Sequence, residues 1–158
     1  TGRRVICITG DVGLSFNIQE LETLYRLNLP VKIFVFDNGG CGITRAFRME
    51  KFSGELAGVD AQHGLTLPNY IDIAREYGLS VFYIDHPVYL KEEIHRFFDH
   101  ASSGPALCDV DMHSGYDLQP KLGWSSPIED QYPFLPRDEF KSNMIIKPLE
   151  GWEHPTYP

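Results

Sequence analysis

Residues 31–40 read Val31-Lys32-Ile33-Phe34-Val35-Phe36-Asp37-Asn38-Gly39-Gly40. The first six positions are mostly apolar, which is typical of a strand buried in a parallel sheet. The polar and glycine residues that follow end the strand. The same order occurs earlier, where the run from Arg4 to Thr9 is followed by Gly10-Asp11-Val12-Gly13. The two segments predict two buried strands, each ending in a glycine-rich loop.

The segments around these strands alternate between helix and strand patterns. Apolar residues recur at steps of three and four from Asn17 to Leu27, with Asn17 as the expected N-cap. Further helices are predicted over 68–77 and 90–101, and further strands over 79–84 and 106–112. The stretch 49–67 and the tail from His113 are predicted to be irregular, apart from a turn of helix near 136–140. This order predicts an α/β protein, a Rossmann-like α/β/α sandwich with a mainly parallel sheet.

Length and composition exclude several classes of protein. The 158 residues carry a net charge of -8, with 14 basic against 22 acidic residues, which argues against a nucleic-acid partner. No apolar run approaches the roughly 20 residues of a membrane helix, and no signal peptide is visible, so a cytoplasmic protein without a membrane partner is expected. The three cysteines are widely spaced and predict neither a disulfide nor a zinc site.

The two strand ends carry the residues that are candidates for binding a ligand. In a parallel sheet, ligands bind beyond the carboxyl ends of the strands. Asp11 offers a carboxylate oxygen there and Asn38 an amide oxygen. Such hard ligands suit Mg2+, which prefers to share its coordination shell with phosphate oxygens. Taken singly, Asp and Asn at a strand end are more often turn formers than ligands.

Spacing and context connect these loops to a known family. The stretches 10–21, 29–32 and 37–42 resemble the thiamine-diphosphate fingerprint, which opens with Gly-Asp-Gly and closes with Asn-Asn, and Asp11 and Asn38 stand 38 − 11 = 27 positions apart, as in that family. Segments 64–70 and 127–139 resemble the end of acetolactate synthase-like proteins. The resemblance therefore covers essentially the whole chain.

The resemblance implies a role for each matching position. Mg2+ would be bound by the side chains of Asp11 and Asn38 and by the carbonyl of Gly40. The backbone at Val12 and Gly13 would meet the diphosphate. The central part of the cofactor would contact Cys41, Gly42 and Ile43, and Phe47 would line the pocket of the acceptor substrate.

The resemblance also implies an activity and a domain organisation. The chain would be the cofactor-binding portion of a 2-oxo acid decarboxylase or carboligase, with thiamine diphosphate and Mg2+ as cofactors. Residues 1–112 would form the α/β domain, lacking its first strand and helix, and residues 113–158 an irregular tail packed on it. The activating glutamate would come from a pyrimidine-binding domain in the same gene or a partner subunit, and the complete enzyme would be a homo-oligomer. No catalytic residue is assigned within this chain.

Two observations leave alternatives open. Val12 replaces the second glycine of Gly-Asp-Gly, and a valine would be strained if that position required a positive φ. The chain could therefore be a non-catalytic remnant of the fold that acts through protein interaction. A plain nucleotide-binding Rossmann domain is disfavoured, because no GxGxxG follows the first strand.

Overall fold

The computed structural model of the chain describes residues 3–100, 104–112 and 127–155. The elements follow in the order β1 (Val5–Gly10), α1 (Asp11–Ser15), α2 (Glu20–Arg26), β2 (Val31–Asp37), α3 (Gly42–Lys51), η1 (Ala61–His63), α4 (Tyr70–Glu76), β3 (Ser80–Ile84), η2 (Pro87–Tyr89), α5 (Leu90–His100), β4 (Ala106–Asp111) and α6 (Arg137–Asn143). Among the helices in these ranges, none has both the length and the apolar character needed to cross a membrane.

The chain divides into two compact units, Thr1–Tyr116 and Asp117–Pro158. The first unit contains all four strands and five of the six α-helices. The second contains α6 and the loops around it. The tail was predicted to begin at residue 113, and its first part, residues 113–126, lies outside the described residues. The expectation that the tail packs on the α/β domain stays a prediction.

The four strands form one parallel sheet in the order β1-β2-β4-β3. Each predicted strand is confirmed, with ends shifted by one residue at most. Val5 pairs with Val31 at the start of the sheet, and Asp37 pairs with Asp111 at its carboxyl edge. The parallel arrangement brings the loop after β1 and the loop after β2 to the same edge, as the sequence predicted.

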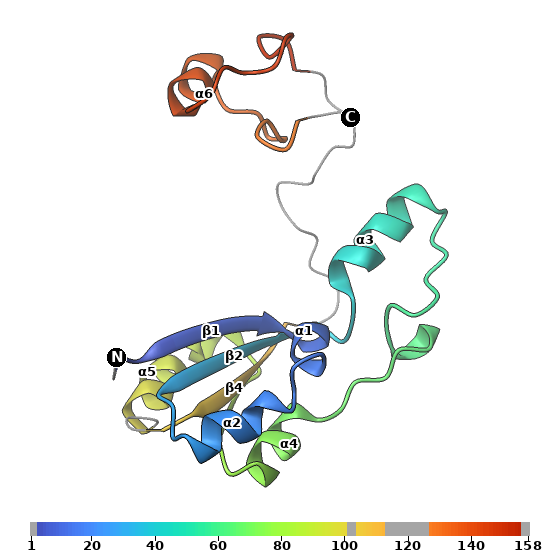
Figure 1. The fold of residues 1–158 in the computed structure, drawn as a ribbon. Helices are drawn as coiled ribbons and strands as arrows, with labels where there is room; N and C mark the ends of the chain where they lie inside the picture. Colours follow the sequence, from blue (N-terminus) through green and yellow to red (C-terminus); the bar gives the residue numbers. More distant parts are fainter. Residues whose placement is uncertain (1–2, 101–103, 113–126, 156–158) are drawn as a thin grey trace. The chain divides into compact units, whose positions relative to one another are not determined.

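The order of the strands explains how the helices form two outer layers. The chain moves in one direction across the sheet from β1 to β2 and on to β3, and then returns to β4. Because such crossovers are right-handed, a reversal of direction places the following helix on the opposite face. Figure 1 shows this arrangement, with α2 and α4 along one face and α5 on the other.

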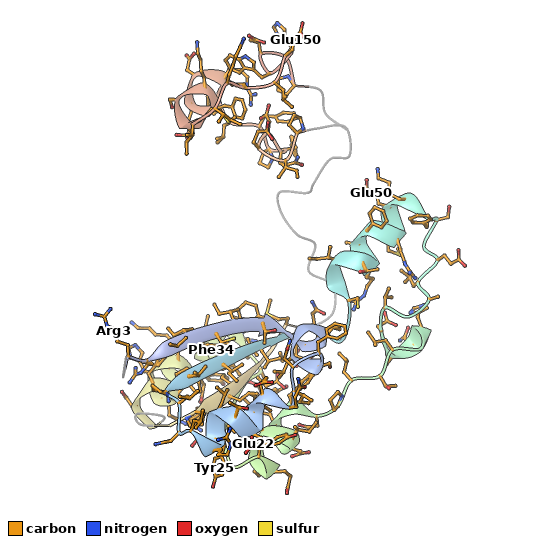
Figure 2. All side chains as sticks on the ribbon, in the orientation of Figure 1. Arg3, Glu22, Tyr25, Phe34, Glu50 and Glu150 are labelled. Atoms are coloured by element: carbon orange, nitrogen blue, oxygen red, sulfur yellow. The ribbon has the colours of Figure 1, made fainter. Side chains whose placement is uncertain are left out.

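Each face has its own apolar core. The face under α2 and α4 buries Val35 and Leu107 of the sheet. Helix α2 contributes Leu21 to this core and helix α4 contributes Ala74. The face under α5 is dominated by aromatic side chains. The ring of Phe34 lies edge-on to that of Phe97, with 4.9 Å between centroids (Figure 2). Both cores end at the carboxyl edge of the sheet, where polar side chains begin.

The first strand corrects one expectation. The sequence predicted a buried strand over residues 4–9, but β1 lies at the edge of the sheet and its apolar side chains are mainly exposed. Val5 is 52% exposed, Ile6 55% and Ile8 63%. An edge strand is covered only where a neighbouring element packs on it, and the described residues supply none for these side chains.

Three helices also differ from the sequence prediction. The first is α1, which begins at Asp11, where a glycine-rich loop was expected. The helix expected from Asn17 begins at Glu20, and its N-cap is Gln19, without a side-chain bond. Asn17 instead accepts the N–H of Glu20 through its carbonyl in the turn between α1 and α2. The helix α3 was not predicted. None of its residues is buried, so no core contact reinforces its weak sequence signal.

Candidate functional site

Asp11 connects the loops after β1 and β2. It is the first residue of α1 and its side chain is almost completely buried, at 2% exposure. Its Oδ1 accepts the N–H of Val12 at 2.7 Å, and its Oδ2 accepts the N–H of Gly40 at 2.8 Å. A carboxylate has about four acceptor positions, so lone pairs remain for a cation. The structure thus joins the two loops that the sequence singled out.

Burial raises the pKa of Asp11. The two backbone N–H groups act in the opposite direction, and the nearby Asp37 carboxyl raises the pKa further. The charged form of Asp11 is therefore held at a cost in solvation. A bound cation would offset that cost by restoring a favourable partner for the carboxylate.

Asn38, two residues before Gly40, has an unsatisfied side-chain oxygen. Its Oδ1 is buried and has no hydrogen-bond partner among the described residues. A buried acceptor without a partner is unfavourable, so such an atom in a folded protein points to a ligand. A Cβ added at Gly42 would lie 2.7 Å from the Asn38 Nδ2, so the glycine makes room for this amide.

Gly40 holds its position because it lacks a side chain. Its φ is +147°, and a Cβ there would collide with the carbonyl oxygen of Val59. The segment beside it is fixed by the Cys41 N–H, which donates to the Val59 carbonyl at 2.8 Å. The carbonyl of Gly40 accepts the N–H of Gly42 at 3.0 Å and keeps one lone pair.

The donor set fits Mg2+ in type: one carboxylate, one amide oxygen and one backbone carbonyl. Only one of these three ligands is a His, Cys, Asp or Glu side chain. The described ranges contain no cluster of three or more such side chains that could hold a metal ion. The assignment of Asp11, Asn38 and Gly40 as metal ligands stays a prediction.

The residues expected at the diphosphate lie in α1. Val12 has helical backbone, and the described residues other than glycine with a positive φ are Asn28 and Ser53. The strain considered for valine at this position is therefore absent. The Val12 N–H already donates to the Asp11 carboxylate. The neighbouring residue Gly13 is exposed to solvent.

Tyr70 supports the first loop from α4, and the sequence interpretation did not identify it. Its side chain is 1% exposed, and its hydroxyl donates to the Asp11 carbonyl at 2.5 Å. Ser15 Oγ lies 2.6 Å from the same hydroxyl. Burial raises the pKa of Tyr70, which keeps the phenol protonated as a donor. A tyrosine in the first turn of a predicted helix gives no sign of this long-range contact.

The other predicted cofactor residues lie at the start of α3. Cys41 is its N-cap and is half-buried, and Gly42 is the first helical residue. Ile43 is 73% exposed. Phe47 is one turn further along, with its ring 5.6 Å from that of Phe52. Their roles against the cofactor and substrate stay predictions.

An acidic cavity of about 210 Å³ lies at the carboxyl ends of β2, β3 and β4. Its described lining residues are Asp37, Asn38, Gly39, Tyr83, Asp109 and Asp111. The sequence interpretation named Asn38 here but missed Tyr83, Asp109 and Asp111. A signal was present, because two aspartates interrupt the otherwise apolar strand 106–112 at alternate positions.

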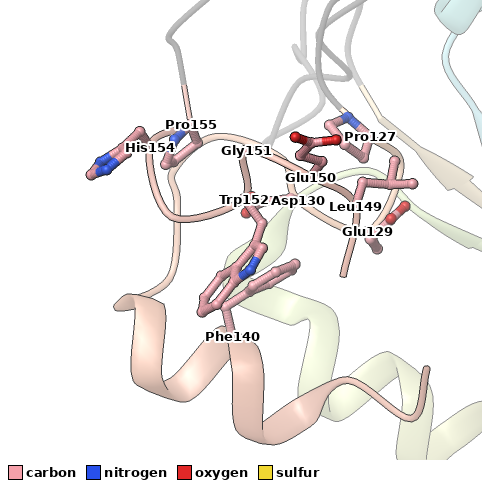
Figure 3. Close-up of a pocket in the computed structure, with 10 residues that line it drawn as sticks. All are labelled: Pro127, Glu129, Asp130, Phe140, Leu149, Glu150, Gly151, Trp152, His154 and Pro155. Atoms are coloured by element: carbon pink, nitrogen blue, oxygen red, sulfur yellow. The ribbon is translucent and has the colours of Figure 1, made fainter. Parts of the chain in front are cut away.

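The second unit has a cavity of its own, of about 220 Å³. Figure 3 shows Trp152 beside Phe140, with Glu129 and Glu150 on the loops that border the cavity. The two rings are 5.8 Å apart at their centroids. The residues predicted to bind the cofactor belong to the first unit.

Comparison with known proteins gives consistent results. Residues 1–110 match the family model described as "Thiamine pyrophosphate enzyme, C-terminal TPP binding domain". The chain is 29% identical over 146 residues to an acetolactate synthase large subunit from Parasynechococcus marenigrum, covering 92% of this chain and 21% of that protein. It is 30% identical over 143 residues to the acetolactate synthase large subunit of Buchnera aphidicola subsp. Schlechtendalia chinensis, covering 90% of the chain and 22% of the relative.

A third relative extends the range of organisms. The chain is 33% identical over 119 residues to a probable acetolactate synthase large subunit from Methanococcus aeolicus, covering 74% of the chain and 19% of that protein. The chain therefore spans about a fifth of the length of each of these relatives.

Proposed function

The chain belongs to the thiamine pyrophosphate enzymes, as their C-terminal TPP binding domain of the acetolactate synthase-like type, and on this basis we propose that it binds Mg2+ together with the cofactor's diphosphate. Asp11 and Asn38 would bind the metal through side-chain oxygens, and Gly40 through its carbonyl. The Gly13 N–H would meet the diphosphate, and the Val12 N–H would contribute once it is released from Asp11.

The observation that carries the proposal is the unpartnered Oδ1 of Asn38. It belongs to the same loop as the Gly40 N–H that binds the Asp11 carboxylate. A divalent cation at this position would satisfy the amide oxygen and neutralise the buried carboxylate at once. The Asp11 carboxylate is already held by the backbone N–H groups of Val12 and Gly40.

When bound, thiamine diphosphate supplies the carbanion-stabilising group needed to decarboxylate a 2-oxo acid. The residues of this chain would fix the metal and the diphosphate, and the start of α3 would border the reacting part. Phe47 would line the acceptor pocket. The activating glutamate would come from a pyrimidine-binding domain, and the working enzyme would be an oligomer that acts on a small 2-oxo acid.

The test is isothermal titration of thiamine diphosphate into the chain with Mg2+ present. We expect saturable binding that disappears when Mg2+ is chelated. Gly42→Ala should weaken binding by about 10- to 100-fold, because its methyl would displace the Asn38 amide that holds the metal. The matched control is Thr44→Ala on the exposed side of α3, which should bind as the unmodified chain does.

The alternative function is a non-catalytic remnant that acts through protein interaction, and the exposed apolar side chains of β1 favour it. That reading predicts no Mg2+-dependent binding, with or without an added pyrimidine-binding domain. It also predicts that Val12→Gly changes nothing. Absence of binding in every one of these titrations would reject the cofactor proposal and leave the remnant.

A further inference from the structure

The acidic cavity is lined by polar side chains from three strands, which the register of the sheet brings together. Asp37 is paired with Asp111, and Tyr83 with Asp109. Paired residues of neighbouring parallel strands lie on the same face, and so do residues two positions apart on one strand. All four side chains therefore belong to one face, directly beyond the apolar core that contains Val35 and Leu107.

Asp109 provides the evidence that the cavity binds a ligand. Its side chain lines the cavity and is only 7% exposed, yet its Oδ1 has no hydrogen-bond partner within the described part of the chain. The described lining residues include three carboxylates and no lysine, arginine or histidine. A buried carboxylate oxygen facing such a cavity carries a solvation cost that a cationic donor would remove.

The neighbouring acidic groups are already held in fixed positions. Asp37 Oδ1 accepts the Gly39 N–H at 2.9 Å. Asp111 Oδ2 accepts the Tyr83 hydroxyl at 3.1 Å. These bonds orient the carboxylates around the cavity before any ligand enters. Orientation in advance lowers the entropy cost of binding.

We propose that this cavity is a binding site for a guanidinium group, carried by a small organic ligand. The acidic oxygens are distributed over neighbouring strands, which stand about 4.8 Å apart in a sheet. Among the described residues, no group of three or more His, Cys, Asp or Glu side chains is placed to hold a metal ion. A guanidinium is planar and carries five N–H donors in a fork, so it can contact carboxylates on two strands together.

The site is separate from the proposed cofactor function. It shares Asn38 and Gly39 as lining residues, but Asp109, Asp111 and Tyr83 play no part in the proposed Mg2+ site. The chain alone, without thiamine diphosphate or Mg2+, is therefore the sample for the test. A negative result here leaves the titration of the cofactor unaffected.

The experiment follows backbone amide resonances of the ¹⁵N-labelled chain during titration with methylguanidinium chloride. It is run at pH 7.5, because burial, with Asp37, Asp111 and Asp11, raises the pKa of Asp109 to about 6 and the group is then mainly ionised. We expect saturable shifts centred on Gly39, Tyr83 and Asp109. Asp109→Asn should weaken the apparent affinity by at least about tenfold.

Matched controls separate the site from general charge effects. Asp72→Asn removes one carboxylate from the exposed side of α4 and should leave the affinity unchanged. The variant Tyr83→Phe, which removes the hydroxyl that donates to Asp111, should weaken binding to a smaller extent. An amide spectrum that retains the dispersed pattern of the unmodified chain confirms that each variant is folded.

Several outcomes would overturn the proposal. No saturable shift, or the same shifts in Asp109→Asn, would exclude the site. Equal shifts with sodium chloride at the same ionic strength would show a general effect of salt. Stronger binding of methylammonium or of Mg2+, lost in Asp109→Asn, would replace the guanidinium assignment by a point cation.

Discussion

Asp109 makes the stability of the folded chain depend on pH. Burial, followed by Asp37, Asp111 and Asp11, raises its pKa from the ordinary 3.8 to about 6. Between these values the folded chain binds more protons than the unfolded chain. The free energy of unfolding therefore falls as the pH rises from about 4 to about 6, and the loss persists above that range. Asp11, whose pKa is also raised, acts with the same sign.

We predict that Asp109→Asn stabilises the chain at pH 7.5. A shift of about two pKa units corresponds to about 3 kcal/mol, and the gain should be about 1 to 3 kcal/mol, because the new amide also lacks a partner. Urea unfolding at pH 4.5 and pH 7.5 measures both the gain and the reduced slope with pH. Asp72→Asn, whose side chain is 62% exposed, serves as the control and should keep the original slope. An unchanged slope in Asp109→Asn would contradict the assignment.

At the scale of residues, the sequence identified some members of the candidate site and missed others. Asp11 and Asn38 were found because they follow apolar strands, and Gly40 was implied by the family resemblance. The structure brings Asp11 and Gly40 into contact. Tyr70 was not found, since its contact with Asp11 spans 59 positions of sequence. Whether Val12 is strained depended on a backbone angle, which the sequence alone could not supply.

At the scale of elements, β1 is the exposed edge of the sheet. Register pairs Ile8 with Phe34, so both residues belong to the face that α5 covers further along. Yet Ile6 and Ile8 remain more than half exposed. An apolar edge strand of this kind is a site for self-association.

We predict that Ile8→Lys lowers self-association of the chain at high concentration. A charged side chain on an edge strand opposes pairing with another edge, while the loss of an exposed isoleucine should change stability by less than about 0.5 kcal/mol. Sedimentation velocity over a concentration series gives the readout. Thr44→Lys, an equal change of charge at an exposed position of helix α3, is the control and should associate like the unmodified chain. Equal association of all three chains would refute the role of β1.

The sequence predicted those elements whose apolar residues are buried in a core of the folded chain. Strands β2, β3 and β4 and helices α4 and α5 contribute buried residues, and their sequence periodicity reflects that burial. The helix α3 has Ile43, Ala46 and Phe47 at helical spacing, but none of its residues is buried. Its surrounding glycines favoured the irregular interpretation.

At the scale of the molecule, the second unit is organised around Arg137. Its guanidinium makes two bonds to Asp130, at 2.7 and 3.1 Å, and one to the Trp152 carbonyl at 2.9 Å. It also lies over the ring of Phe140, 4.9 Å from the centroid. The Asp130 carboxylate raises the pKa of Arg137, and its own side chain is nearly buried.

We predict that Arg137→Met destabilises this unit by about 2 kcal/mol or more, because it leaves the Asp130 carboxylate buried without its partner. Hydrogen exchange of the amides over 127–155 should become at least about tenfold faster. Arg75→Met is the matched control, since it removes an ion pair of 2.8 Å to Asp72 in which both side chains are more than half exposed. Such a pair contributes little, and exchange over 127–155 should stay the same. Faster exchange in the control as well would contradict the explanation.

The sequence alone determined the alternation of strands and helices, the parallel sheet and the two strand-end loops with their family resemblance. These features are local, because apolar periodicity and glycine positions are encoded within a few neighbouring residues. Only the tertiary structure decided which strand lies at the edge, that Tyr70 supports the Asp11 loop, and that Asp37, Asp109 and Asp111 border one cavity. The physical reason is that strand order and register bring distant residues together, and burial then changes the charge and bonding of each group.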